Sequence, residues 1–157
     1  MGTPIFVPAA FPPLHSHAVA TDPMVIGPHC KHPFEARWIF YISGLSFGTI
    51  SPPAIEALSR GAAKAGVWLN TGEGGLSLYH LSGGCDIVFQ IGTSKYGVRN
   101  VEGYLNDDKL RDVASHENVR MFEVKMAQGA KPGKGGILPG AKVTAEIAAI
   151  RGIPEGS

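Results

Sequence analysis

The order of apolar runs, glycine-bearing loops and helix-like segments limits the folds open to this chain more than any other feature. Four short apolar runs lie at residues 38–43, 67–70, 86–91 and 121–126. Segments with apolar residues at helical spacing lie at 54–65, 107–115 and 144–151, and the second unit has the weakest helical pattern. This alternation predicts an α/β fold in which helical crossovers connect the strands of a parallel sheet.

The first apolar run, WIFYIS at 38–43, predicts a strand that is buried on both faces. Glycine-bearing loops begin at the C-terminal ends of the runs, and they read GLSFGTIS, TGEGG, GTSKYG and KMAQGAKPGKGGILPG. In parallel α/β folds, ligands bind at this edge of the sheet. We therefore expect the functional site there, with loop backbone close to a ligand and amides able to form anion-binding nests.

Residues 1–36 differ in character from the rest of the chain. They contain seven prolines and no sustained periodicity, which predicts an irregular arm ahead of a domain at 37–157. His29, Cys30 and His32 lie in this arm and suggest a metal site as an alternative. Their spacing is not that of a zinc finger, so we expect no metal.

Composition narrows the class of protein. Charged residues make up 17% of the chain and the net charge is +1, which gives no reason to expect nucleic acid or a membrane surface as partner. Two cysteines, Cys30 and Cys85, are too few for a disulfide framework. Because we find neither a signal-peptide pattern nor an 18-residue apolar run, we expect a cytoplasmic protein.

Four motifs, in order, resemble the FMN-binding domain of glutamate synthase and especially its short stand-alone relatives. They are ISGLSFGTIS, NTGEGGLSLYHL, QIGTSKYGVR and KMAQGAKPGKGGILPGAKVT, within residues 37–156. The resemblance implies a TIM-type (β/α)8 barrel, of which this chain would provide the first four βα units. It also implies a flavoprotein oxidoreductase acting on CH-NH2 donors in glutamate biosynthesis. Such an enzyme uses FMN, with an iron–sulfur cluster in the full enzymes, to aminate 2-oxoglutarate or a related keto acid reductively with ammonia or glutamine.

The resemblance further implies roles for individual residues. The implied catalytic residues are Lys125 and Glu73; the cofactor-binding residues are Gly44, Leu45, Ser46, Gln90 and Lys125; the substrate-binding residues are Gln128 and Lys131. Lysines suit these roles, because a cation beside a flavin stabilises negative charge on the reduced ring and lysines pair with carboxylates.

One loop departs from the family pattern. Where glutamate synthases usually read PGEGGQLPG, this chain reads PGKGGILPG, with Lys134 in place of an acid and Ile137 in place of a glutamine that contacts 2-oxoglutarate. Isoleucine cannot donate that hydrogen bond, and an unpaired buried polar group costs about 1–3 kcal/mol. The identity of the keto acid is therefore open.

The length of the chain raises a second question, since a complete barrel needs about 250 residues and this sequence has 157. The closing strands, the phosphate-binding loops and the cluster cysteines of the family have no counterpart here, and Cys30 and Cys85 do not match them. An open half-sheet leaves bare edges. We expect a second chain or a second copy to complete the barrel; the alternative is a non-catalytic truncated or assembly subunit that has lost FMN binding.

Overall fold

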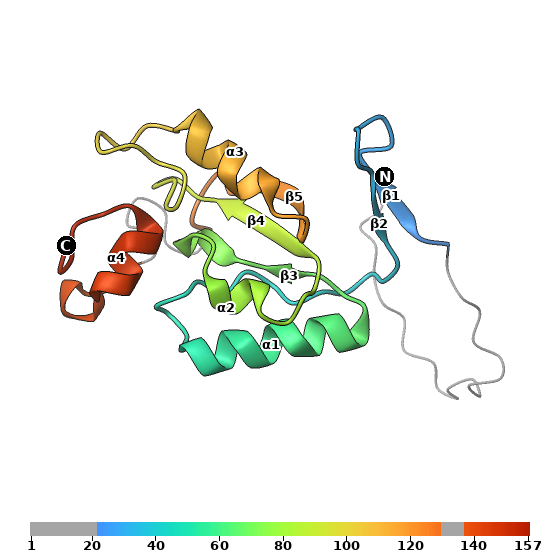
Figure 1. Cartoon of the computed structure of the whole chain (residues 1–157), viewed down its shortest axis with the longest axis horizontal. Coiled ribbons are helices and arrows are strands. Elements are labelled where there is room, and N and C mark those ends of the chain that lie inside the picture. The colour runs from blue at the N-terminus through green and yellow to red at the C-terminus, as the bar shows by residue number, and fades with distance from the viewer. Residues whose placement is uncertain (1–21, 130–136) are drawn as a thin grey trace.

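The structure is a computed structural model that describes residues 22–129 and 137–157 (Figure 1). Its central sheet contains three parallel strands, β3 (Leu69–Asn70), β4 (Ile87–Ile91) and β5 (Val119–Val124), paired in that order. The connections run through α2 (Leu78–Leu81) and α3 (Asp107–Ser115). Within the described residues the sheet is open, and the (β/α)8 barrel stays a prediction.

Three helices lie at the predicted segments 54–65, 107–115 and 144–151, within two residues of the predicted bounds. Helix α1 (Pro52–Ala65) has proline in its first turn and ends at Gly66, whose φ of 67° is left-handed. In α3 the Asn106 side chain accepts a hydrogen bond from the amide of Lys109, and Thr144 caps α4 (Ala145–Arg151) in the same way. The helix of the second unit, α2, is only 4 residues long.

The prediction of a strand buried on both faces at 38–43 is wrong. Ile42 alone pairs with the sheet: its amide donates to the Trp68 carbonyl at 3.1 Å, and its carbonyl accepts from the Asn70 amide at 3.0 Å. The four preceding side chains, at 38–41, are between 46% and 77% exposed. The reason is that this segment lies at the edge of the sheet, where no further strand of the described residues pairs with it or covers its apolar side chains.

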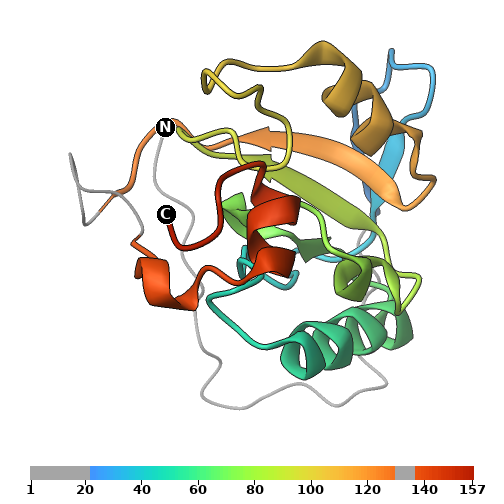
Figure 2. The same ribbon diagram turned by 60° about the vertical axis from the view of Figure 1, so that its left-hand side comes forward.

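Helix α4 is present as predicted at 144–151, but it does not cover β5. It packs beyond the carboxyl ends of the strands, as Figures 1 and 2 show from two sides. There Ile147 and Ala148 join Phe47, Ile55 and Val143 in one apolar cluster. Alternate residues of β5 are therefore left in contact with solvent, and Phe122 and Val124 are 42% and 63% exposed.

Two further clusters lie between the sheet and its other helices. One joins α1 to the sheet, and the other joins β4 to α3. The first contains Ala62, Val67, Leu69, Cys85 and Ile87, and the second contains Phe89, Val98 and Val113. Together the three clusters hold the carboxyl ends of β3 and β4 in a rigid frame.

The described part of the arm, from residue 22 to 36, is more regular than expected. Strands β1 (Met24–Ile26) and β2 (Phe34–Ala36) form an antiparallel hairpin at the end of the molecule opposite α4 (Figure 1). Residues 1–21 lie outside the described part of the chain. Among the described helices, none is long and apolar enough to cross a membrane. The same residues contain no group of three or more His, Cys, Asp or Glu side chains able to hold a metal ion.

Candidate functional site

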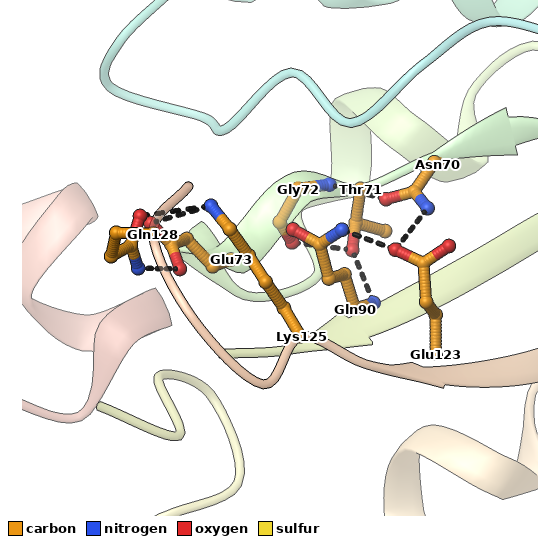
Figure 3. A network of polar contacts seen from close by, with 8 residues as sticks. All are labelled: Asn70, Thr71, Gly72, Glu73, Gln90, Glu123, Lys125 and Gln128. Carbon is orange, nitrogen blue, oxygen red and sulfur yellow. Dashed lines mark hydrogen bonds and ion pairs between the residues drawn. The ribbon is translucent and has the colours of Figure 1, made fainter. Parts of the chain in front are cut away.

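A triangle of side chains lies at the carboxyl ends of β3 and β5 (Figure 3). Lys125 Nζ donates to Gln128 Oε1 at 2.9 Å and lies 3.4 Å from Glu73 Oε1. Gln128 Nε2 donates to Glu73 Oε2 at 2.8 Å, which closes the triangle. The Lys125 and Glu73 side chains are 32% and 21% exposed, so a small molecule can reach both charges.

A second polar group links the three strands behind this triangle. Glu123 Oε1 accepts hydrogen bonds from Asn70 Nδ2, at 3.1 Å, and from Gln90 Nε2. Because side chains alternate along a strand, Glu123 and Lys125 project from the same side of the chain. Glu123 thus binds donors from β3 and β4, and Glu73, which follows β3, binds donors that follow β5, as the dashed lines of Figure 3 show.

Hydrogen bonds to Thr71 and Gly72 fix the end of β3. Thr71 Oγ1 accepts from the Gln90 amide at 3.1 Å and donates to the Gly72 carbonyl at 2.8 Å. The Gly72 amide donates to Asn70 Oδ1 at 2.9 Å. The 3-10 helix η2 (Gly72–Gly74), which carries Glu73, is therefore tied to both β3 and β4.

Glycines allow the loop at 44–46 to lie directly on η2. A Cβ at Gly72 would be 2.7 Å from both the amide nitrogen and Oγ of Ser46, and the Gly72 φ of 63° also disfavours other residues. A Cβ at Gly44 would be 3.0 Å from Asn70 Oδ1. At Gly92, a Cβ would collide with the Glu73 carboxylate. The loop at 44–46 thus contacts the backbone of η2 directly, and the loop after β4 contacts the Glu73 side chain through Gly92.

Arg151, in the last turn of α4, lies buried beside this site. Its Nη2 donates to the Phe47 carbonyl at 3.3 Å, and its guanidinium carbon lies 5.0 Å from the centre of the Tyr96 ring. Within residues 22–129 and 137–157, its Nε has no hydrogen-bond partner and no carboxylate pairs with it. Arg151 also lines a cavity of about 160 Å³ together with Ser46 and Glu73. A buried, unpaired cation facing a cavity favours an anionic ligand.

The structure brings most of the predicted site residues together. Lys125, Glu73 and Gln128 contact one another, Gln90 contacts Glu123, and Gly44, Leu45 and Ser46 form the loop against η2. Lys131 and Lys134 lie outside the described residues, and Ile137 is exposed.

The sequence analysis missed Asn70, Glu123 and Arg151. Signals for two of them were present. Asn70 directly precedes the TGEGG loop, and Glu123 stands two positions before Lys125 in a strand. Arg151 carried a weaker signal, since a basic residue in the last turn of a helix is ordinary. Its place on the buried face, one turn after Ile147 and Ala148, identifies it only once the packing is known.

Comparison with known proteins adds the family. The sequence model of a family described as a conserved region in glutamate synthase matches residues 13–157. The chain belongs to the glutamate synthase family. This match includes the carboxyl ends of β3, β4 and β5 and every side chain of the candidate site.

Individual members of the glutamate synthase family are similar over most of this chain. A glutamate synthase large subunit-like protein, YerD, of Bacillus subtilis is 44% identical over 137 residues, which is 86% of this chain and 26% of that protein. A large subunit-like protein of Rhizobium meliloti is 36% identical over 80% of this chain and 26% of its own length. An archaeal glutamate synthase [NADPH] of Archaeoglobus fulgidus is 39% identical over 73% of this chain and 20% of its own length. The chain thus spans a fifth to a quarter of the relatives it matches.

Proposed function

We propose that this chain is part of an FMN-dependent glutamate synthase-type oxidoreductase that reductively aminates 2-oxoglutarate or a related keto acid. Membership of the family supports a role of the glutamate synthase type. The observation that carries the proposal is the accessible triangle of Lys125, Glu73 and Gln128 at the strand ends. A cation and a carboxylate held together at this edge suit flavin chemistry on an anionic substrate.

The donors around the triangle fit an isoalloxazine ring, which carries oxygen and nitrogen acceptors along one edge. Gln90 and Lys125 bring N–H groups from adjacent strand ends, and the loop at 44–46 brings backbone beside them. These residues would hold the ring, with Lys125 Nζ stabilising negative charge at its edge. When bound, FMN supplies the hydride chemistry of the reaction.

Glu73 orients the groups that would meet the substrate. Its Oε1 pairs with Lys125 and its Oε2 accepts from Gln128, so one carboxylate sets the position of a cation and an amide. The same carboxylate is reachable by solvent and can hold or return a proton of an incoming amine. Arg151, with Gln128 and Lys131, would bind the carboxylates of the keto acid.

We propose further that another polypeptide segment completes the sheet into a (β/α)8 barrel. The apolar side chains at 38–41 flank one edge of the sheet, and Phe122 and Val124 lie on the strand at the other. Exposed apolar surface at both edges is what an incomplete barrel leaves. A second chain, a second copy or a continuation of this chain would each cover these surfaces.

A flavin titration of the purified chain tests the function, run alone and in any complex that the chain forms on a size-exclusion column. We expect FMN to be bound, and Lys125→Ala to weaken its affinity about tenfold through loss of one charge-assisted contact. Lys64→Ala is the matched control, since Lys64 is exposed in the last turn of α1. A chain that takes up no FMN in either form contradicts the proposal and favours the non-catalytic subunit.

A further inference from the structure

The loop that follows β4 brings an aromatic side chain to the cavity beside the candidate site. It reads GTSKYG at 92–97, and the proposed function assigns no role to its side chains. Tyr96, in this loop, is half-buried and lines the cavity of about 160 Å³ together with Arg151, Ser46 and Glu73. The Arg151 guanidinium carbon lies over the Tyr96 ring, 5.0 Å from its centre. This distance is within the range of a cation–π interaction.

Hydrogen bonds and packing fix the backbone on both sides of Tyr96. The Lys95 amide donates to the Gly92 carbonyl at 3.0 Å, and the Val98 amide donates to the Lys95 carbonyl at 3.1 Å. The Val98 side chain is fully buried in the cluster that joins β4 to α3. Lys95 also has a left-handed φ of 51°, a conformation that persists only where the surrounding structure imposes it. The ring is therefore carried by a turn that is held on both sides.

The same turn contacts the backbone of Arg151. The Gly97 amide donates to the Arg151 carbonyl at 3.1 Å, and a Cβ at Gly97 would lie 3.0 Å from the Gly75 Cα. In addition, Arg151 Nη2 donates to the Phe47 carbonyl at 3.3 Å. Neighbouring loops thus contact the main chain of Arg151 at one point and its side chain at two, and none of these three contacts uses a charge of opposite sign.

An aromatic ring and a carboxylate would stabilise this cation with different consequences. Arg151 is 7% exposed, so its charge needs a compensating interaction. A carboxylate would attract the guanidinium, but it would also neutralise the charge and occupy N–H donors. The face of a ring attracts the cation through its quadrupole and carries no net charge. Within residues 22–129 and 137–157, no carboxylate forms an ion pair with Arg151. The ring thus stabilises the charge without cancelling it.

We propose that Tyr96 is a positioning residue, whose ring holds the guanidinium of Arg151 at the wall of the cavity with its charge available to a carboxylate of the substrate. The use of that charge by a keto acid rests on the proposed function, whereas the placement of Arg151 does not. The alternative is that Tyr96 serves only its own loop. The Arg99 guanidinium carbon also lies over the ring, 5.9 Å from its centre, and Arg99 Nη1 donates to the Ser94 carbonyl at 3.3 Å. In that case the position of Arg151 would not depend on the ring.

Two substitutions at one position separate these roles. Tyr96→Phe keeps the ring, and Tyr96→Leu keeps an apolar side chain without a π face. Tyr104→Leu is the matched control, because Tyr104 is 71% exposed in the same connection between β4 and α3. Under the positioning role, both the setting of Arg151 and the affinity for a carboxylate ligand depend on an aromatic ring at residue 96.

Nuclear magnetic resonance of the chain provides the first test, because it needs no ligand. We expect nuclear Overhauser contacts between the Arg151 side chain and the Tyr96 ring in the wild type. The Arg151 Nε–H signal should keep its position in Tyr96→Phe and in Tyr104→Leu, and it should move in Tyr96→Leu. A wild-type chain without these contacts overturns the proposal even if the variants fail to fold. An Arg151 signal that is unchanged in Tyr96→Leu also overturns it.

The second readout is the affinity for 2-oxoglutarate, titrated into the FMN-supplied chain alone and in any complex that it forms. We expect Tyr96→Leu to weaken this affinity about tenfold, as for one lost cation–π contact, and Tyr96→Phe to restore it to within about twofold of wild type. FMN affinity should change less than twofold in both, because the ring acts on Arg151 and not on the donors at the strand ends.

The outcomes distinguish this proposal from the proposed function. If Arg151 behaves as expected in the resonance spectra but the wild-type chain and its complexes bind no 2-oxoglutarate, the proposed function fails while the placement of Arg151 by Tyr96 stands. If 2-oxoglutarate binds and Tyr96→Leu matches the wild type, the positioning role fails alone. Equal losses in Tyr96→Phe and Tyr96→Leu, or equal losses of FMN and 2-oxoglutarate affinity in Tyr96→Leu, also overturn the positioning role.

Discussion

The carboxyl end of the sheet and its two lateral edges differ in the side chains that they present and in how those side chains are satisfied. At the carboxyl end, polar side chains from β3, β4 and β5 hydrogen-bond one another, and glycines bring the loops into contact. At the edges, apolar side chains at 38–41 and on β5 face solvent. The candidate site is thus largely determined by contacts within these residues, whereas the edges need surface from elsewhere. Four predictions test this difference.

The largest effect is expected at Gly72. Its φ of 63° and the 2.7 Å from a Cβ to the Ser46 amide make Gly72→Ala both strained and overpacked. We expect a loss of about 2–4 kcal/mol in the free energy of unfolding, measured by urea denaturation. Gly84→Ala is the matched control, since its φ is 72° with nothing within 4 Å of a Cβ. A loss no greater than that of the control would show that the loop contacts at the site contribute little.

Acid should destabilise the fold through His80, a buried residue of α2. Its pKa of about 4 in the folded chain lies below the value of about 6.5 in an unfolded chain. The unfolded chain binds the proton first, so the His80 contribution is complete above pH 6.5 and falls as the pH drops toward 4, by about 3 kcal/mol in all. Unfolding curves of the wild type and His80→Gln should therefore converge or cross in this window. Parallel curves would contradict the burial of a neutral ring.

Two neighbours on β5 provide the most direct comparison of site and edge. Glu123→Ala leaves the side chains of Asn70 and Gln90 without their shared acceptor, and we expect a loss of about 1–3 kcal/mol. Val124→Ala, one residue on but half-exposed to solvent, should change stability by no more than about 0.5 kcal/mol. Chemical denaturation of both variants under one set of conditions measures the contrast. Equal losses would mean that the two faces of β5 are not distinct.

The last prediction concerns the edge of the sheet, where association should change more than stability. Phe122→Ser removes an aromatic ring that is 42% exposed and packs edge-on against Phe89, and we expect a loss of about 1–2 kcal/mol in the free energy of unfolding. Its effect on association should be larger, because that surface is free to bind another chain. Light scattering coupled to size exclusion measures the change, with Val101→Ser in an exposed loop as control. If the wild type associates with itself and Phe122→Ser has the same mass distribution, the contact between chains lies on another surface.

The parts of the fold that were predictable depend on local signals. Helices α1, α3 and α4 begin at Ser51 with its prolines, at Asn106 and at Thr144, each a capping residue beside an apolar pattern. Glu73 and Lys125 were predictable for a related reason. Glu73 lies in the loop after the run at 67–70, Lys125 lies at the end of the run at 121–126, and the ends of parallel strands meet at one edge.

The parts that were not predictable depend on distant partners. An apolar run such as 38–43 indicates burial but not which surface provides it, and here Ile42 alone pairs with the sheet. The hairpin of β1 and β2 pairs two segments of 3 residues each, which are too short for periodicity to identify as strands. The role of Arg151 could not be predicted, because its buried side chain contacts the Phe47 carbonyl, over a hundred residues earlier in the chain. That no carboxylate of residues 22–129 and 137–157 pairs with it becomes visible only in three dimensions.

The position of α4 has a consequence for how this site can change. Lys125 and Gln128 lie at one end of the segment that follows β5, and Arg151 lies at its other end, so both ends are anchored at the same place. Insertions between anchored ends carry a small entropic penalty, about 0.6 kcal/mol for each doubling of length. The intervening residues that precede α4, including Lys134 and Ile137, can therefore vary in number and type at little cost. Under the function proposed above, selectivity for a substrate can change there while Lys125, Gln128 and Arg151 keep their places.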